Sequence, residues 1–271
     1  MAAKKILFIT TEISPYLVDT EMSVIARNLP QGIHERGKEI RTFMPKFGAI
    51  NERRNQLHEV IRLSGMNLII NDTDHPLIIK VASIQAARMQ IYFIDNEDFF
   101  QRKYLLHDAD GNEFEDNDER AIFYVRGVME TVRKLRWVPD LIHCHGWITA
   151  LAPVYIRKHY KGDPCFKNSK IVYSIYDDEF KTPFKNDFPK KMKIDGVTQN
   201  DIKVLKEKSD FETLSKLAID FSDGVIQGSP NIHSGVREYA KQKEGGFFLD
   251  YHPEETYIDA FNDFYDQLLN K

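Results

Sequence analysis

This chain of 271 residues has few cysteines, no long apolar run and no excess of positive charge. Its two cysteines, Cys144 and Cys165, are too few for a disulfide framework and too far apart to suggest a metal clip, so we expect reduced thiols. The apolar run that follows Lys5 is only about five residues long, shorter than a secretory core or a membrane span. We therefore expect a cytoplasmic protein with no membrane partner.

The charge balance excludes a further class of function. With 37 Lys and Arg against 41 Asp and Glu, the formal net charge is -4. The densest basic stretch is the short segment 189–193, so no broad positive field exists to attract a phosphate backbone. We expect no nucleic-acid partner.

Glycine is absent from the turn that follows the first apolar strand, residues 5–11. Folds that bind nucleotides place glycines there, because bare backbone amides at a helix N-terminus can then approach a diphosphate. The corresponding positions, which we name the first turn, are Val18, Asp19, Thr20, Glu21 and Met22. Two of these five residues carry a carboxylate, so the first turn decides whether the chain can hold a nucleotide.

Apolar runs alternate with helical stripes along the chain, which predicts a parallel sheet covered on both faces. The main predicted elements are helix 20–35, strand 39–44, helix 117–135, strand 140–143, helix 148–158, strand 170–175, helix 211–220 and helix 230–241. Short alternating runs over 58–90 predict a β-hairpin insertion. We predict a single α/β domain over 1–271, Rossmann-like and three-layered, with a mostly parallel sheet.

The last predicted helix, 254–269, is unusually aromatic on one face. We expect this face to pack back on the core of its own domain. A dimer contact is the alternative, since an exposed aromatic face would need a partner.

The densest chemical cluster, residues 140–147, lies at the carboxyl end of a central strand, where ligands of open parallel sheets bind. His143 is expected to be a core histidine with both ring nitrogens satisfied, and His145 to cap the next helix or pack under Trp147. The two histidines alternate faces of a strand and no third ligand stands at a useful spacing, so we predict no metal site.

Three other clusters are weaker. The acidic stretch 108–119 does not keep the ligand positions of a calcium loop and is expected to be solvated. The trio 177–179 is also expected to be a solvated loop rather than a metal site. The aromatic residues Phe180, Phe184 and Phe188 form either a sugar-stacking surface or a loop packed on the sheet, and the sequence leaves both open.

Several motifs together resemble the amino-terminal half of bacterial glycogen synthases and plant starch synthases. They are Lys5-Ile-Leu-Phe-Ile-Thr-Thr-Glu12, Met44-Pro-Lys-Phe-Gly48, Tyr92-Phe-Ile-Asp-Asn96, Asp116-Asn-Asp-Glu-Arg120, Pro139-Asp-Leu-Ile-His-Cys-His-Gly-Trp147 and Ser222-Asp-Gly-Val-Ile-Gln-Gly-Ser-Pro230. The resemblance covers about residues 4–241, nearly the whole chain.

This resemblance implies one half of a two-domain, GT-B type glycosyltransferase that moves glucose from ADP-glucose to an α-1,4-glucan. It implies substrate contacts at His145, Gly146, Trp147, Asp116 and Asn117, with His145 touching the transferred sugar. In the family the second domain holds most of the nucleotide and the catalytic glutamate. Only about forty residues follow the last matched strand, so we expect that domain to be missing.

The matched half departs from the family where it would touch the donor. The family's Lys-x-Gly-Gly-Leu becomes Val18-Asp-Thr-Glu-Met22, its His-Asp-Trp becomes His145-Gly-Trp147, and its Thr-Ile-His-Asn becomes Ser174-Ile-Tyr-Asp177. A carboxylate about 4 Å from a phosphate charge, at an effective dielectric near 20, repels it by about 4 kcal/mol. That corresponds to about three decades of affinity.

These departures lead to a functional prediction. We expect a degenerate glycogen or starch synthase homologue without autonomous glucosyl transfer, acting as a binding or regulatory module for a glucan, a sugar nucleotide or a protein, and needing no cofactor. A half-enzyme completed by a second chain is the alternative, and a structural oligomerisation domain is another.

Overall fold

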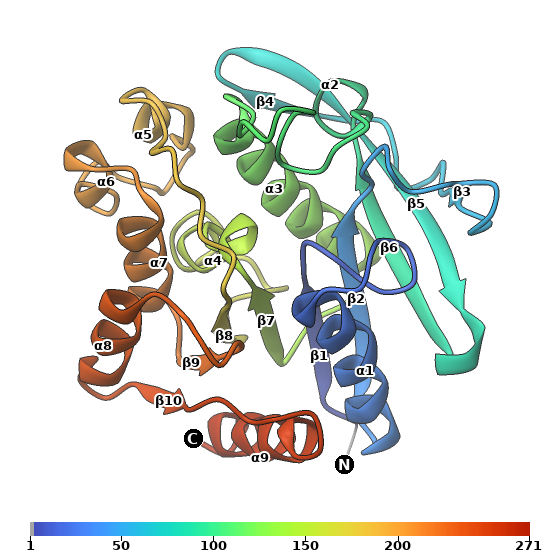
Figure 1. Ribbon diagram of the computed structural model, residues 1–271, viewed down its shortest axis with the longest axis vertical. Helices are drawn as coiled ribbons and strands as arrows, with labels where there is room; N and C mark the ends of the chain where they lie inside the picture. The colour runs from blue at the N-terminus through green and yellow to red at the C-terminus, as the bar shows by residue number, and fades with distance from the viewer. Residues whose placement is uncertain (1–2) are drawn as a thin grey trace.

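The computed structural model describes residues 3–271; the first two residues of the predicted domain lie outside the described part. Figure 1 shows a twisted sheet with helices on both of its faces. Its parallel portion has the order β10-β9-β8-β7-β1-β2-β6. The bounds are β1 Lys5–Ile9, β2 Glu39–Pro45, β6 Met89–Asp95, β7 Leu141–His145, β8 Lys170–Ile175, β9 Gly224–Gln227 and β10 Phe247–Leu249.

An antiparallel extension continues this sheet beyond β6. Strand β5 (Thr73–Ile84) pairs with β6, and both β3 (His58–Glu59) and β4 (Met66–Ile70) pair with β5. Asn71 and Asp72 connect β4 to β5 with φ of 50° and 61°, the left-handed backbone that tight hairpin turns require. The predicted fold class, a mostly parallel sheet with a small β-hairpin insertion, is confirmed.

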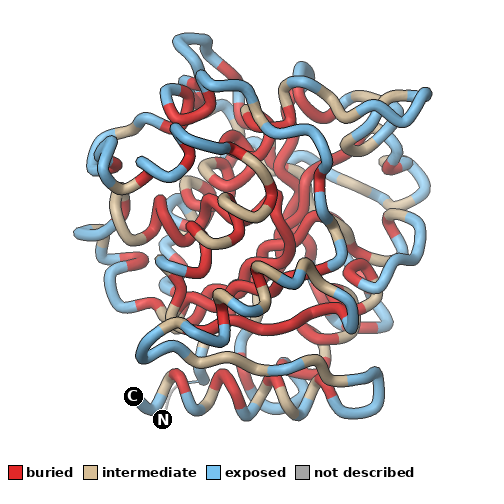
Figure 2. Tube along the Cα trace, turned by 60° about the vertical axis from the view of Figure 1, so that its left-hand side comes forward, coloured by how far each residue is buried: buried red, intermediate tan, exposed pale blue. Residues whose placement is uncertain are grey.

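Two hydrophobic cores lie on opposite faces of the sheet. Leu7 and Ile9 of β1 contribute to the first core, whereas Ile6 and Phe8 contribute to the second, because successive side chains of a strand alternate. The first core is covered by α3 (Asn117–Leu135), α4 (Ala152–Lys158) and α7 (Phe211–Asp220), and the second by α1 (Glu21–Glu35) and α9 (Tyr257–Leu269). Figure 2 shows the strands as a buried interior under a mostly exposed outline.

Helix α9 lies against α1 and buries its aromatic face in the second core. Tyr265 is fully buried, and Phe261 and Phe264 are nearly so. The aromatic face of α9 is therefore covered by the chain's own core residues. None of the helices among residues 3–271 is both long and apolar enough to cross a bilayer.

Several predicted helices differ from the structure in their bounds. The helix predicted over 148–158 is two elements, the 3-10 turn η2 (Trp147–Thr149) and α4, because Pro153 favours the first turn of a new helix. Helix α8 begins at Ser234 rather than at 230, and strand β10 was not predicted. The remaining short elements are η1 Gln85–Ala87, α2 Glu97–Phe100, α5 Phe188–Lys191 and α6 Val204–Glu207.

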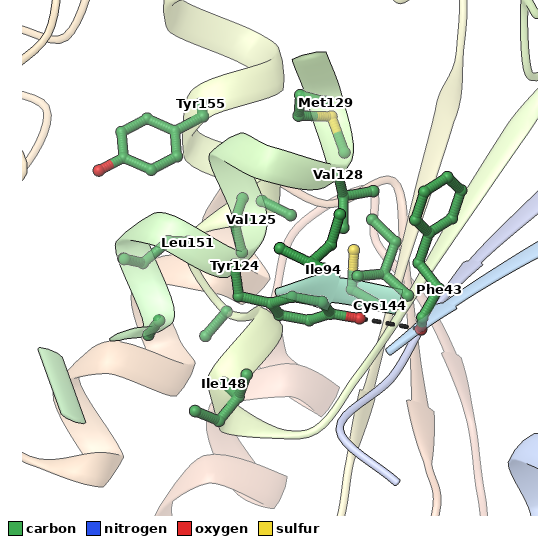
Figure 3. Close-up of a cluster of buried hydrophobic side chains, with 14 of the residues drawn as sticks. Phe43, Ile94, Tyr124, Val125, Val128, Met129, Cys144, Ile148, Leu151 and Tyr155 are labelled. Carbon is green, nitrogen blue, oxygen red and sulfur yellow. Dashed lines mark hydrogen bonds between the residues drawn. The ribbon is translucent and has the colours of Figure 1, made fainter. Parts of the chain in front are cut away.

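A buried tyrosine fixes α3 against the ends of the central strands. The hydroxyl of Tyr124 lies 2.9 Å from the backbone oxygen of Phe43 (Figure 3). It also lies 2.7 Å from the backbone oxygen of Thr10. Val125, Val128 and the other apolar residues around it close the first core. The loop that precedes α3 is thereby held beside the carboxyl ends of β1 and β2.

Candidate functional site

A cavity of about 610 Å³ opens at the carboxyl ends of β1, β7 and β8. The sheet order reverses here, since β2 and β6 follow on one side of β1 and β7 and β8 on the other. Ligands of open parallel sheets bind at such a switch point. The wall comprises the turn after β1, the start of α1, the loop before α3, the end of β7 and the loop after β8.

The N-terminus of α1 is already occupied by side chains of the protein itself. Thr20 is the N-cap residue: its hydroxyl oxygen accepts from the backbone N–H of Ser23 at 3.0 Å, while the Ser23 hydroxyl accepts from the N–H of Thr20 at 2.8 Å. The Thr20 hydroxyl also donates to the Glu12 carboxylate at 2.6 Å. Burial raises the pKa of Glu12, and the bond from Thr20 opposes that shift. An anion at this helix end would meet a carboxylate rather than bare amides.

The two histidines of β7 are both fully buried. His143 has its ring nitrogens 2.6 Å from the hydroxyls of Tyr265 and Ser174, which confirms the predicted core histidine with both nitrogens satisfied. His145 has Nδ1 2.8 Å from the Tyr176 hydroxyl. Desolvation lowers the pKa of His145 to about 3, so its ring is neutral.

Tyr176 explains why His145 does not reach the cavity. Its ring lies over His145, with ring centroids 5.8 Å apart, and forms part of the cavity wall. It also fills the space beside Gly228, where an added Cβ would stand 2.7 Å from the ring. In this structure His145 is therefore buried behind Tyr176 and does not line the cavity.

Gly146 and Trp147 lie in close contact with the Asp178 carboxylate. The backbone N–H of Trp147 donates to Asp178 Oδ2 at 2.9 Å, and Oδ1 of the same carboxylate is buried without a partner in the described chain. Desolvation, opposed by the Trp147 bond, raises the pKa of Asp178 to about 7. The prediction of a solvated loop is therefore wrong for Asp178, although Asp177 and Glu179 are exposed.

Asp116 and Asn117 have structural partners at the start of α3. Asp116 is the N-cap residue, but its side chain makes no capping bond and pairs instead with Arg102. Asn117 donates to the backbone oxygen of Leu106 at 2.9 Å and accepts from Arg120 at 2.6 Å. Only Asn117 of the two reaches the cavity wall.

Hydrogen bonds and salt bridges join the acidic loop, residues 107–119, to the aromatic loop, residues 176–191. Glu113 accepts two backbone N–H bonds from the aromatic loop, each of 2.8 Å, and these bonds hold the pKa of Glu113 below its ordinary value against the effect of burial. Lys191 lies 2.8 Å from the buried Asp118, and Lys185 lies 2.7 Å from Glu115. The prediction of a solvated acidic stretch is therefore wrong for Glu113 and Asp118, whereas Glu115 is exposed as expected.

The aromatic residues of the second loop form a packed cluster. Phe180 stacks on Phe184 with ring centroids 4.6 Å apart and meets Trp147 edge-on at 4.9 Å. Phe188 is fully buried. Of the two possibilities left open by the sequence, the structure shows the packed loop.

The structure divides the predicted site residues into two groups. On the cavity wall lie Thr20, Glu21, Met22, Asn117 and Trp147. Off the wall lie Val18, Asp19, Asp116, His145 and Gly146.

Other wall residues were missed from the sequence, notably Glu12 and Ser229. Both follow parallel strands by two or three residues, and this position was the available signal.

Negative charge dominates the wall. The lining carboxylates are Glu12, Glu21, Glu113, Asp177, Asp178 and Glu179, and the lining bases are His107 and Lys181. Apart from Glu113, none of these six carboxylates takes part in a salt bridge within residues 3–271. No group of three His, Cys, Asp or Glu residues suited to a metal ion is found in the same range.

Comparison with known proteins agrees with this architecture. The starch synthase catalytic domain family matches residues 5–248. The glycogen synthase of Chlorobaculum parvum is 32% identical over 247 residues, covering 91% of this chain and 49% of the relative. That of Chlorobium phaeobacteroides is 37% identical over 174 residues, covering 64% of this chain and 36% of the relative.

A solved structure shares the fold. The catalytic domain of starch synthase IV from Arabidopsis thaliana, bound to ADP and acarbose, superposes with a TM-score of 0.71 at 16% identity, covering 92% of this chain and 51% of that one. The chain thus spans about half the length, or less, of the proteins that it matches. Together with the cavity at the sheet's switch point, these matches show that the chain belongs to the starch synthase catalytic domain family of glycogen and starch synthases.

Proposed function

We propose that this chain is a glycogen synthase-like binding module that does not transfer glucose by itself. The observation that carries the proposal is the state of the α1 N-terminus, where Thr20 caps the helix and holds the Glu12 carboxylate. Glu21 adds a second carboxylate to the same wall. We further propose that it works in the cytoplasm, where its two free, buried thiols stay reduced.

The electrostatic cost for a nucleotide sugar is large. A diphosphate seated at this helix end would lie among carboxylates, and each one within about 4 Å costs about 4 kcal/mol at an effective dielectric near 20. Lys181 and the histidine His107 are the only bases on the described wall. Lys181 lies on the rim formed by the aromatic loop, whereas Glu12 and Glu21 stand at the helix end itself.

Restoring the family's first turn tests the proposal. The variant V18K/T20G/E21G returns the lysine and both glycines, and E21Q serves as a control that removes one charge without freeing backbone amides. We expect no measurable ADP-glucose binding by the parent in calorimetry, a gain in affinity in E21Q of at most the about three decades that one carboxylate costs, and a larger gain in the triple variant.

Enzyme assays complete the test. Incubation of the parent with ADP-glucose and glycogen should release no ADP. Turnover by the parent alone would refute the proposal. Turnover only after adding a chain that supplies the remaining half of a relative would favour the half-enzyme instead.

A further inference from the structure

We propose that residues 179–183 of the aromatic loop, which we name the lid, open and close the end of the cavity at Trp147, and that Glu113 is the latch that keeps them closed. Phe180 and Lys181 of the lid lie on the cavity wall together with Trp147. The inference deepens the proposed function, because it concerns access to the same cavity. It rests on that function only for the identity of what enters.

The first observation is that the lid has few attachments along its backbone. It contains no helix or strand, and four of its five residues are exposed. No backbone group of the lid hydrogen-bonds to another backbone group within residues 3–271. The Glu113 carboxylate holds it instead, by accepting the N–H groups of Lys181 and Thr182 at 2.8 Å each. A segment with so few backbone bonds opens at a lower free energy than the core does.

The second observation is that both ends of the lid are fixed. At one end, the Asp178 carboxylate accepts the N–H of Trp147 at 2.9 Å. At the other end, the N–H of Phe184 donates to the backbone oxygen of Ser209 at 2.9 Å. Motion is therefore confined to the residues between these two anchors, which is the arrangement of a hinged loop.

The third observation is that a closed turn presents the latch. The Asp108 side chain accepts the backbone N–H groups of Asp110 and Asn112, at 2.9 and 2.8 Å. The N–H of Asp108 donates to the backbone oxygen of Asn112 at 2.8 Å. His107 and Glu113 then form an antiparallel bridge across the turn. Because the turn fixes Glu113 in advance, closing the latch has to order only the lid.

The fourth observation is a single aromatic side chain under the lid. Of the five lid residues only Phe180 is buried. Its ring meets Trp147 edge-on with centroids 4.9 Å apart and stacks on Phe184 at 4.6 Å. Trp147 is itself only 3% exposed. Opening of the lid would therefore withdraw Phe180 and uncover the Trp147 ring at the cavity wall.

Quenching of Trp147 fluorescence by acrylamide tests the inference without a cavity ligand. The chain has two tryptophans, so a W137F background leaves Trp147 as the one emitter. Variant E113A removes both acceptors of the latch, and E113Q keeps one. The matched control is E115A, because Glu115 is an exposed carboxylate of the same acidic loop that pairs with the Lys185 side chain, outside the lid.

We expect E113A to raise the quenching constant at least about threefold over the W137F background, E113Q to lie between the two, and E115A to match the background. Urea unfolding shows whether each variant is folded in buffer, and where E113A is not, E113Q decides the comparison. Equal quenching with and without the latch, or an equal rise in E115A, would overturn the inference.

Limited digestion with trypsin gives a second measurement in the chain that keeps Trp137. Cleavage after Lys181, in the lid, should be about tenfold faster in E113A than in the parent or in E115A. Equal rates in E113A and the parent would contradict the latch. ADP release by the parent would refute the proposed function, whereas the lid is judged by quenching and digestion, which involve no nucleotide sugar.

Discussion

Replacing Asp178 by asparagine should stabilise the protein at pH 8 and change little at pH 4. Burial, with contributions from the charges of Glu12 and Asp177, raises the pKa of this carboxyl from 3.8 to about 7. The folded state therefore binds a proton more tightly than the unfolded chain, and the parent loses stability as the pH rises from about 4 to about 7. Full ionisation at the higher pH costs about 4 kcal/mol. Asparagine keeps the acceptor for the Trp147 N–H and carries no charge.

Urea unfolding of parent and variant, at intervals between pH 4.5 and 8.5, measures this difference. We expect the free energy of unfolding of D178N to exceed that of the parent by about 2 to 4 kcal/mol at pH 8, with the gain disappearing towards pH 4. D74N, which removes an exposed carboxylate, should show no such trend. A difference that does not vary with pH, or a variant less stable than the parent at pH 8, would refute the reasoning.

Three further substitutions probe the supports of the site, each read by urea unfolding at pH 7. Y265F removes the hydroxyl 2.6 Å from His143 Nδ1 and should cost about 1 to 3 kcal/mol; a loss below about 0.5 would contradict the buried bond. K191M leaves the buried Asp118, 1% exposed, without its cation and should lower the free energy of unfolding by about 3 to 5 kcal/mol. An unchanged free energy of unfolding would mean that the pair does not contribute to stability. G146A places a Cβ against Asp178 Oδ2 at a φ of 75°, so a loss above about 1 kcal/mol is expected, and a neutral result would contradict the close packing at this position.

The sequence predicted those parts of the fold that depend on local patterns. Helices α1 and α3 show long apolar stripes because one face of each is buried, and the central parallel strands are continuous apolar runs because both of their faces are buried. Short elements were less predictable. Strand β10 has only three half-buried residues, so its sequence carries no clear strand pattern. Its pairing with β9 is what makes it a strand.

The site depended on contacts between distant segments, which no local pattern reveals. Glu113 meets the backbone of Lys181 68 residues away, and Lys191 meets Asp118 across 73 residues. The acidic and basic stretches were each recognisable, but their pairing was not. Asp178 likewise accepts a bond from Trp147, 31 residues earlier in the chain, and its Oδ1 is buried.

Gly146 and Asp178 are physically linked at the carboxyl end of β7. Gly146 has φ of 75° and ψ of 175°, a backbone conformation that is essentially restricted to glycine, and a side chain there would collide with Asp178 Oδ2 and with Met22. The Asp178 carboxylate fills the space beside position 146 and is held there by the next N–H of the chain. Asp178 therefore places a carboxylate at the end of β7, on the same cavity wall as Glu21 of the first turn, and both lie where a phosphate group would be repelled.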